Sequence, residues 1–164
     1  MENPYQQPLA DLEGEKRGVD AFKAFERFST WWVFLLGIVT LSFYLPFWMY
    51  TRTQVLNRLP GVEPIGDEFV VITVVLYILA EINGLSGLFR PDKGVLDLTS
   101  QVVSMASNIL FLVWVFKFKN RLNDFLEKNV SGYMPLTSMA TFFMQVIYLS
   151  FKLNQHLDMV EHQA

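Results

Sequence analysis

Hydrophobic residues in this chain gather into four long runs from which charged residues are almost absent. The runs cover residues 28–51, 69–89, 98–116 and 129–151, and the second contains a single acid, Glu81. About 20 consecutive apolar residues suffice to cross the hydrocarbon core of a bilayer. The pattern therefore predicts four transmembrane helices, at about 28–50, 69–89, 98–118 and 133–152.

The fold class follows from the same four runs. Only helices and closed barrels satisfy their backbone hydrogen bonds in lipid. Barrel strands would alternate apolar and polar residues with a period of two, which these runs do not. We expect an all-α fold: an integral membrane bundle of four transmembrane helices with amphipathic helical extensions. The alternative is a soluble bundle with a very apolar core, but runs of this length leave no polar face for water.

The residues before the first run divide into two parts. Residues 1–18 are polar and contain two prolines, which is typical of a disordered tail, so the domain is expected to span 19–164. From Val19 to Phe28, apolar residues alternate with charged ones in a helical pattern. This segment is predicted to be either an amphipathic helix on the membrane surface or a continuation of the first transmembrane helix into water.

Two of the predicted helices continue beyond their apolar runs as polar extensions, 50–59 and 117–129. In the second extension, Leu122, Phe125 and Leu126 form an apolar strip among charged residues. A helix over 98–129 would be about 48 Å long, against about 30 Å of hydrocarbon, so one end would project. We expect the strip to be an exposed interaction surface.

The two extensions also share a sequence pattern. Trp48-x-Tyr50 followed by Leu56-Asn57 matches Trp114-x-Phe116 followed by Leu122-Asn123, with the same internal spacing. The match indicates either a duplicated two-helix unit or a coincidence in a chain rich in leucine and aromatic residues.

Polar residues inside the apolar runs fall at helical spacing and predict a buried polar seam. A charged side chain at the bilayer centre costs about 3 kcal/mol on insertion scales, so Glu81 should face the bundle interior and not the lipid. Helical periodicity places the other candidates on single faces of the second, third and fourth helices. The predicted seam consists of Thr73, Tyr77, Glu81, Gln101, Ser104, Asn108, Thr141, Gln145 and Tyr148.

Composition and motifs exclude several kinds of chemistry. The net charge of −3 argues against nucleic-acid binding, and the absence of cysteine excludes disulfides and thiol catalysis. No catalytic, phosphate-binding or dinucleotide-binding motif is present. His156 and His162 are six residues apart, which is not the i,i+4 spacing of a helical metal site. We therefore expect no enzyme activity, cofactor or metal.

The first run also carries a family resemblance. Thr40, Tyr44 and Phe47-Trp48, followed by Leu56-Asn57, resemble the pattern T-x-G-x-Y-x-x-Y-W with a following L-N helix. This pattern is typical of a bacterial family of small multi-spanning membrane proteins grouped as a domain of unknown function. The resemblance covers about 32–59, and Ser42 stands where the family usually has glycine. It implies an integral membrane protein and no particular activity.

Two functions remain open from the sequence. The first is an accessory or interaction subunit that docks a membrane protein partner, or a second copy, through its projecting helices. The second is an oligomeric channel or transporter lined by polar faces that include Glu81. Basic residues, seven on one predicted side and six on the other, do not decide the orientation. The resemblance implies a multi-pass protein of the bacterial inner membrane with cytoplasmic termini.

Overall fold

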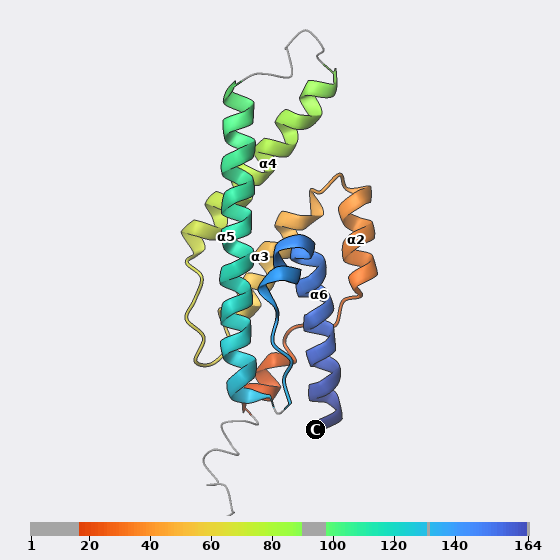
Figure 1. Cartoon of the computed structure of the whole chain (residues 1–164), viewed down its shortest axis with the longest axis vertical. Helices are drawn as coiled ribbons and strands as arrows, with labels where there is room; N and C mark the ends of the chain where they lie inside the picture. Colours follow the sequence, from red (N-terminus) through yellow and green to blue (C-terminus); the bar gives the residue numbers. More distant parts are fainter. Residues whose placement is uncertain (1–16, 90–97, 131, 164) are drawn as a thin grey trace, which may run out of the picture.

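The computed structural model of the chain describes residues 17–89, 98–130 and 132–163, which form helices joined by turns. Within these residues there is no strand, so the all-α prediction is confirmed. A short helix at 17–22 is followed by α2 (Thr30–Val39), α3 (Tyr44–Leu56), α4 (Asp67–Phe89), α5 (Leu98–Asn129) and α6 (Ser138–Gln163). α5 lies at the centre and packs against α3, α4 and α6 (Figure 1).

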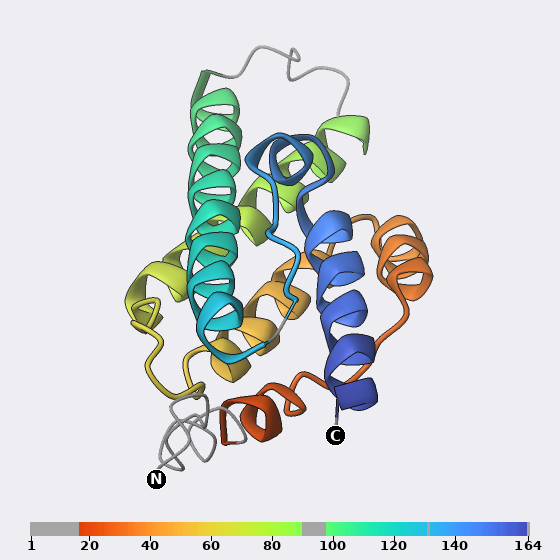
Figure 2. The same cartoon turned by 60° about the horizontal axis from the view of Figure 1, so that its bottom comes forward.

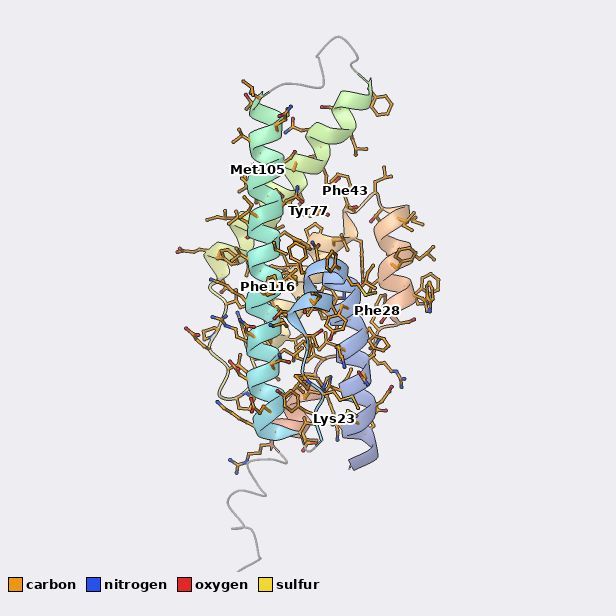
Figure 3. All side chains as sticks on the ribbon, in the orientation of Figure 1. Lys23, Phe28, Phe43, Tyr77, Met105 and Phe116 are labelled. Atoms are coloured by element: carbon orange, nitrogen blue, oxygen red, sulfur yellow. The ribbon has the colours of Figure 1, made fainter. Side chains whose placement is uncertain are left out.

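The length of α5 gives the molecule two different ends. Its second half lies in a core of aromatic and aliphatic side chains, which includes Trp48, Trp114 and Phe118. Its first half and the end of α4 extend away from that core (Figure 1). The first half of α5 exposes apolar side chains that include Val102, Met105 and Ile109. Lys23 lies at the core end, and Met105 lies on the extended part of α5 (Figure 3).

The prediction of four transmembrane helices is wrong for the described residues. Two helical segments are long and apolar enough to cross a membrane, Asp67–Gly87 and Leu98–Asn129. They correspond to the second and third predicted helices. The first and fourth apolar runs are interrupted by non-helical backbone, which apolar composition alone does not reveal.

The first run is divided into α2 and α3 by a reversal at residues 40–43. α2 has ten residues and is therefore about 15 Å long, half the thickness of a hydrocarbon core. Leu41 and Ser42 have positive φ angles of 48° and 70°, which end the helix. Pro46 lies in the first turn of α3, where a missing N–H is tolerated, so it begins a helix here and does not bend one.

The fourth run is interrupted twice. Residues 132–137 are not helical, and α6 begins only at Ser138. Within α6, Gln145 has φ 40° and ψ −119°, which separates the first turns from the rest of the helix. The two parts of α6 run in different directions (Figure 2).

The predicted interaction strip is not on the surface. Leu122, Phe125 and Leu126 are all buried in the core. The residues that cover the strip include Phe22, whose ring stacks on Phe125 at 6.1 Å, while Phe25 meets Phe118 at 6.4 Å. The segment from Val19 to Phe28 thus contributes to the core, because its apolar face has a partner within the chain. Of the tail predicted over 1–18, residues 1–16 lie outside the described residues, and residues 17 and 18 belong to the short helix at 17–22.

The two halves that share the tryptophan and Leu-Asn pattern also share an arrangement of hydrogen bonds between an asparagine side chain and the backbone. Asn57 donates to the carbonyl of Ile65 and accepts from its N–H, both at 2.9 Å. Asn123 makes the same pair of hydrogen bonds to Leu136, at 3.1 and 2.9 Å. Each loop also contains a glycine with positive φ, Gly61 at 74° and Gly132 at 71°. Each asparagine therefore fixes the loop that leads to the next helix.

The tryptophans of the two halves meet in the core but differ in their hydrogen bonds. Their rings form a T-shaped contact at 6.3 Å. Trp114 Nε1 donates to Thr53 Oγ1 at 2.9 Å, whereas Trp48 Nε1 is buried with no partner among the described residues. The position equivalent to Thr53 in the second half is Lys119, which offers no acceptor and instead donates to Ser138 Oγ at 2.9 Å.

A buried histidine joins α6 to the loop before it. His156 Nδ1 lies 2.7 Å from the carbonyl of Lys152, and the Met134 N–H donates to Nε2 at 3.4 Å. Together these contacts require a neutral ring with its proton on Nδ1. Burial lowers the pKa of His156 below its ordinary value, and the neighbouring Lys152 charge acts in the same direction.

We therefore expect the protein to lose stability on acidification. The unfolded chain takes up a proton at His156 at a higher pH than the folded chain. The contribution of neutral His156 to the stability of the fold is therefore complete above about pH 6.5. It is lost as the pH falls towards the lower pKa that His156 has in the folded protein. Thermal unfolding of the detergent-solubilised protein between pH 7.5 and 5 measures this loss. The unfolding temperature should depend less steeply on pH in His156→Gln than in the wild type. An equal dependence in both proteins would assign the effect to other groups.

Candidate binding site between two broken helices

The reversal between α2 and α3 is built by Thr40. Its hydroxyl donates to the carbonyl of Leu36 at 2.6 Å and accepts from the N–H of Tyr44 at 2.9 Å. One side chain thus serves the last turn of α2 and the first turn of α3. The Ser42 N–H then donates to the carbonyl of Gly37 at 2.6 Å, which closes the end of α2.

Ser42 adopts a backbone conformation that favours glycine. Its φ of 70° is in the left-handed region, which costs residues with a Cβ about 1–2 kcal/mol. Residues 40–43, within the segment that carries the family resemblance, are therefore the turn between two helices and not the middle of one helix.

Replacing Ser42 with glycine should stabilise the protein slightly, by up to about 1 kcal/mol. The gain is the relief of the left-handed strain, reduced by the greater backbone freedom of glycine in the unfolded chain. Thermal unfolding of Ser42→Gly and Ser42→Ala separates the two contributions, since both lack the hydroxyl and only glycine relaxes the backbone. A glycine variant no more stable than the alanine variant would contradict the strained turn.

The break at Gln145 lies across a pocket from the break at Ser42. The pocket has a volume of about 460 Å³ and is bounded by α2, the α2–α3 turn, α5 and the start of α6. Its lining includes Val33, Gly37, Ser42, Phe111 and Gln145. Small-molecule sites have volumes of about 300–1,000 Å³ and mostly apolar walls with a few polar groups. The pocket fits this description.

Polar groups lie behind one wall of the pocket. The Tyr77 side chain interacts with those of Ser42 and Glu81, and its ring lies 5.3 Å from that of Phe111. Ser42 and Phe111 both line the pocket, so Tyr77 supports that wall from α4. Figure 3 shows Tyr77 near the middle of the molecule, between α4 and the α2–α3 turn.

The residues of the predicted polar seam lie in several places. Gln145 lines the pocket, Tyr77 lies against the lining residue Phe111, and Glu81 neighbours Tyr77. Thr73 and Thr141 are buried, and their hydroxyls donate to backbone carbonyls one turn earlier. The Tyr148 hydroxyl accepts a hydrogen bond from the Thr137 N–H. Ser104 is half-buried, whereas Gln101 and Asn108 are exposed. The predicted residues thus do not form one seam, since they differ in burial and in their hydrogen-bond partners.

Sequence patterns did not point to the pocket. Of its lining residues, only Gln145 was a candidate, and the pocket exists because two apolar runs break opposite each other. The combination of Thr40, a small residue at 42 and Pro46 was the available signal for the first break. No comparable signal marks Gln145, which is preceded and followed by apolar residues.

In the part of the chain that the structure describes, the fold is all-α, with two helices of membrane-crossing length and a mostly apolar pocket between the α2–α3 turn and the break in α6. The chain belongs to the family described as "Domain of unknown function (DUF4234)", which matches residues 28–124. The match includes the α2–α3 turn, α4 and most of α5. Comparison with curated proteins and with solved structures finds no match.

Proposed function

We propose that this chain is an integral membrane protein without enzyme activity that serves as an accessory or interaction subunit. Its α4–α5 hairpin crosses the bilayer and docks a membrane protein partner or a second copy. The observation that carries membrane insertion is the exposure of these helices. Only 17% of the most apolar window of α4 and 22% of that of α5 are buried within the chain. The core helix of a soluble protein would be mostly buried.

The dimensions support this arrangement. The uncharged part of α5, residues 98–116, has 19 residues and is about 28 Å long, close to the thickness of the hydrocarbon core. Charged residues gather at the other end, where Arg121 bonds to Glu63 and Arg27 pairs with Asp158 at 2.8 Å. Two crossings return the chain to its starting side. Following the resemblance, we propose that this side is the cytoplasmic face of the bacterial inner membrane.

The docking surface that we propose lies on α4 and α5. Gly84 and Gly87 share one side of α4, and a Cβ atom at either position would meet nothing within 4 Å. Small residues let membrane helices approach closely. On α5, the exposed amides of Gln101 and Asn108 would be costly against lipid. A partner helix would cover both features, whereas the strip at Leu122 is already covered by the chain itself.

Cross-linking in native membranes tests this proposal. We expect the wild-type protein to remain in the membrane after alkaline carbonate extraction and to form a cross-linked complex. A Gly84→Leu, Gly87→Leu double variant should lose at least about tenfold of that complex, because bulky side chains prevent close approach. Gly66→Leu is the matched control, since Gly66 also has open space and lies outside the helix.

Two results would contradict the proposal in different ways. Release of the wild-type protein by carbonate would exclude an integral membrane protein. An unchanged complex in the double variant would exclude this face of α4 as the docking surface.

A channel or transporter is the second candidate, because Glu81 is half-buried in a helix of membrane-crossing length. Acidic residues at that depth commonly mark ion pathways. Ion flux into proteoliposomes that contain the purified protein distinguishes the two functions. Flux that disappears in Glu81→Gln would favour the channel, and no flux from a folded protein would favour the interaction subunit.

A further inference from the structure

We propose that the pocket between Ser42 and Gln145 binds a neutral lipid with one long apolar chain and a hydroxyl or carbonyl head group. A monoacylglycerol is the simplest molecule of this class. This inference rests on the proposed membrane insertion of the chain, since insertion would bring lipid to the mouth of the pocket.

The floor and the rim of the pocket differ in exposure. Val33, Phe111 and Val146 are buried and form the floor. Phe34, Ile38, Phe143 and Met144 also line it but are exposed, so the pocket opens between them. This rim continues onto the exposed apolar side chains of α2, which include Trp31 and Leu35. An apolar chain can therefore enter from a lipid environment without crossing a polar barrier.

The volume of the pocket favours an apolar occupant in a bilayer. About 460 Å³ of open space between apolar walls forfeits the dispersion contacts that close packing provides. The rim is apolar and no charged residue is among the lining residues. A lipid chain restores the lost contacts and is the most abundant apolar molecule in the proposed environment.

The polar groups of the pocket favour a lipid with an uncharged head group. Ser42 contributes a hydroxyl and Gln145 an amide, and no hydrogen-bond partner of that amide is found within the described residues. An amide and a hydroxyl both donate and accept, which suits a hydroxyl or carbonyl group. A phosphate or carboxylate head would lack a basic partner, because Lys and Arg do not line this pocket.

Both polar residues owe their position to a break in a helix. Ser42 and Gln145 have φ angles of 70° and 40°, and residues in this region persist where the surrounding structure holds them there. An unbroken helix would turn these side chains to other directions. Irregular backbone at membrane depth is tolerated where it is buried in protein or lines a cavity, and both breaks here line the same one.

Photolabelling in proteoliposomes tests the inference. The probe is a monoacylglycerol with a diazirine in its acyl chain, and labelled peptides are identified by mass spectrometry. We expect saturable labelling of residues 33–38 and 143–147, competed by unlabelled monoacylglycerol. The lipid-facing surfaces of α4 and α5 should instead be labelled without saturation, as expected for bulk lipid.

Gly37→Leu is the blocking variant. A Cβ at Gly37 meets only Leu45, at an ordinary 3.8 Å, so the added side chain fits the helix and fills the pocket. Saturable labelling should fall at least about tenfold, while Gly66→Leu retains it. Gln145→Met keeps the length of the side chain and removes the amide, and should weaken labelling by the glycerol lipid more than labelling by a plain alkyl diazirine.

Distinct results overturn the inference and the proposed function. Equal, unsaturable labelling of the pocket in wild type and Gly37→Leu would overturn the lipid site while leaving membrane insertion intact. A cross-link from benzoylphenylalanine at position 143 to another polypeptide, with no lipid adduct, would show that a protein segment fills the pocket. Absence of label on α4 and α5 would overturn membrane insertion itself.

Discussion

Replacing Leu122 with aspartate should unfold the core end of the molecule. Leu122 is fully buried on the second half of α5, in a core of aromatic and aliphatic side chains. The change removes a packed side chain and introduces a buried group without hydrogen bonds, for a combined loss of at least about 4 kcal/mol. Tryptophan fluorescence should report it, because Trp48 and Trp114 lie in the same core.

The matched control is Leu98→Asp, the same substitution on the same helix. Leu98 is exposed in the first turn of α5, where an acidic residue interacts favourably with the helix dipole. We expect its unfolding midpoint to be close to that of the wild type. If Leu122→Asp instead folds normally and loses only association with a partner, the strip is an external docking surface, as the sequence predicts.

Replacing Asn57 or Asn123, the two asparagines that bond to the loop backbone, should destabilise the protein by similar amounts. Asn57→Ala and Asn123→Ala each delete two hydrogen bonds to one residue and leave that residue's N–H and carbonyl without their partner. An unsatisfied buried backbone group costs about 1–3 kcal/mol, so each variant should lose about 2–5 kcal/mol. Hydrogen exchange should show the corresponding loop, and not the other, losing protection.

Asn108→Ala provides the control for the asparagine pair. Its amide is exposed and bonds only to the carbonyl of Ser104 in the same helix, at 2.9 Å. We expect a change of less than about 0.5 kcal/mol. A large loss in one loop variant and none in the other would show that the shared pattern does not mark equivalent positions.

Helix content and the two long helices could be predicted from the sequence, and the breaks could not. α4 and α5 begin and end within a few residues of their expected bounds, because their apolar runs are continuous and are flanked by polar residues in the sequence. The first run looks equally continuous in hydropathy. Its division at Ser42 depends on hydrogen bonds of Thr40 and on φ angles, to which hydropathy is insensitive.

Whether the apolar strip on α5 is exposed or buried could not be predicted from the sequence either. Leu122, Phe125 and Leu126 have the spacing of a docking face, and helical periodicity shows that such a face needs a partner. It does not show whether the partner is another protein or another part of the chain. Here Phe22, about 100 residues away in sequence, supplies part of the cover, since its ring stacks on Phe125. The pocket was hidden for the same reason, since its walls come from distant segments.

The unbroken length of α5 makes it a lever. It has 32 residues and is about 48 Å long, and neither proline nor glycine interrupts it. One arm lies along α4 and the other carries Trp114, Phe118 and Leu122 into the core. We expect a sideways force on the α4–α5 hairpin to tilt α5 and so to reach the core side chains that it carries. In the membrane arrangement that we propose, a partner that arrives beside the hairpin would act on the opposite end of the molecule in this way.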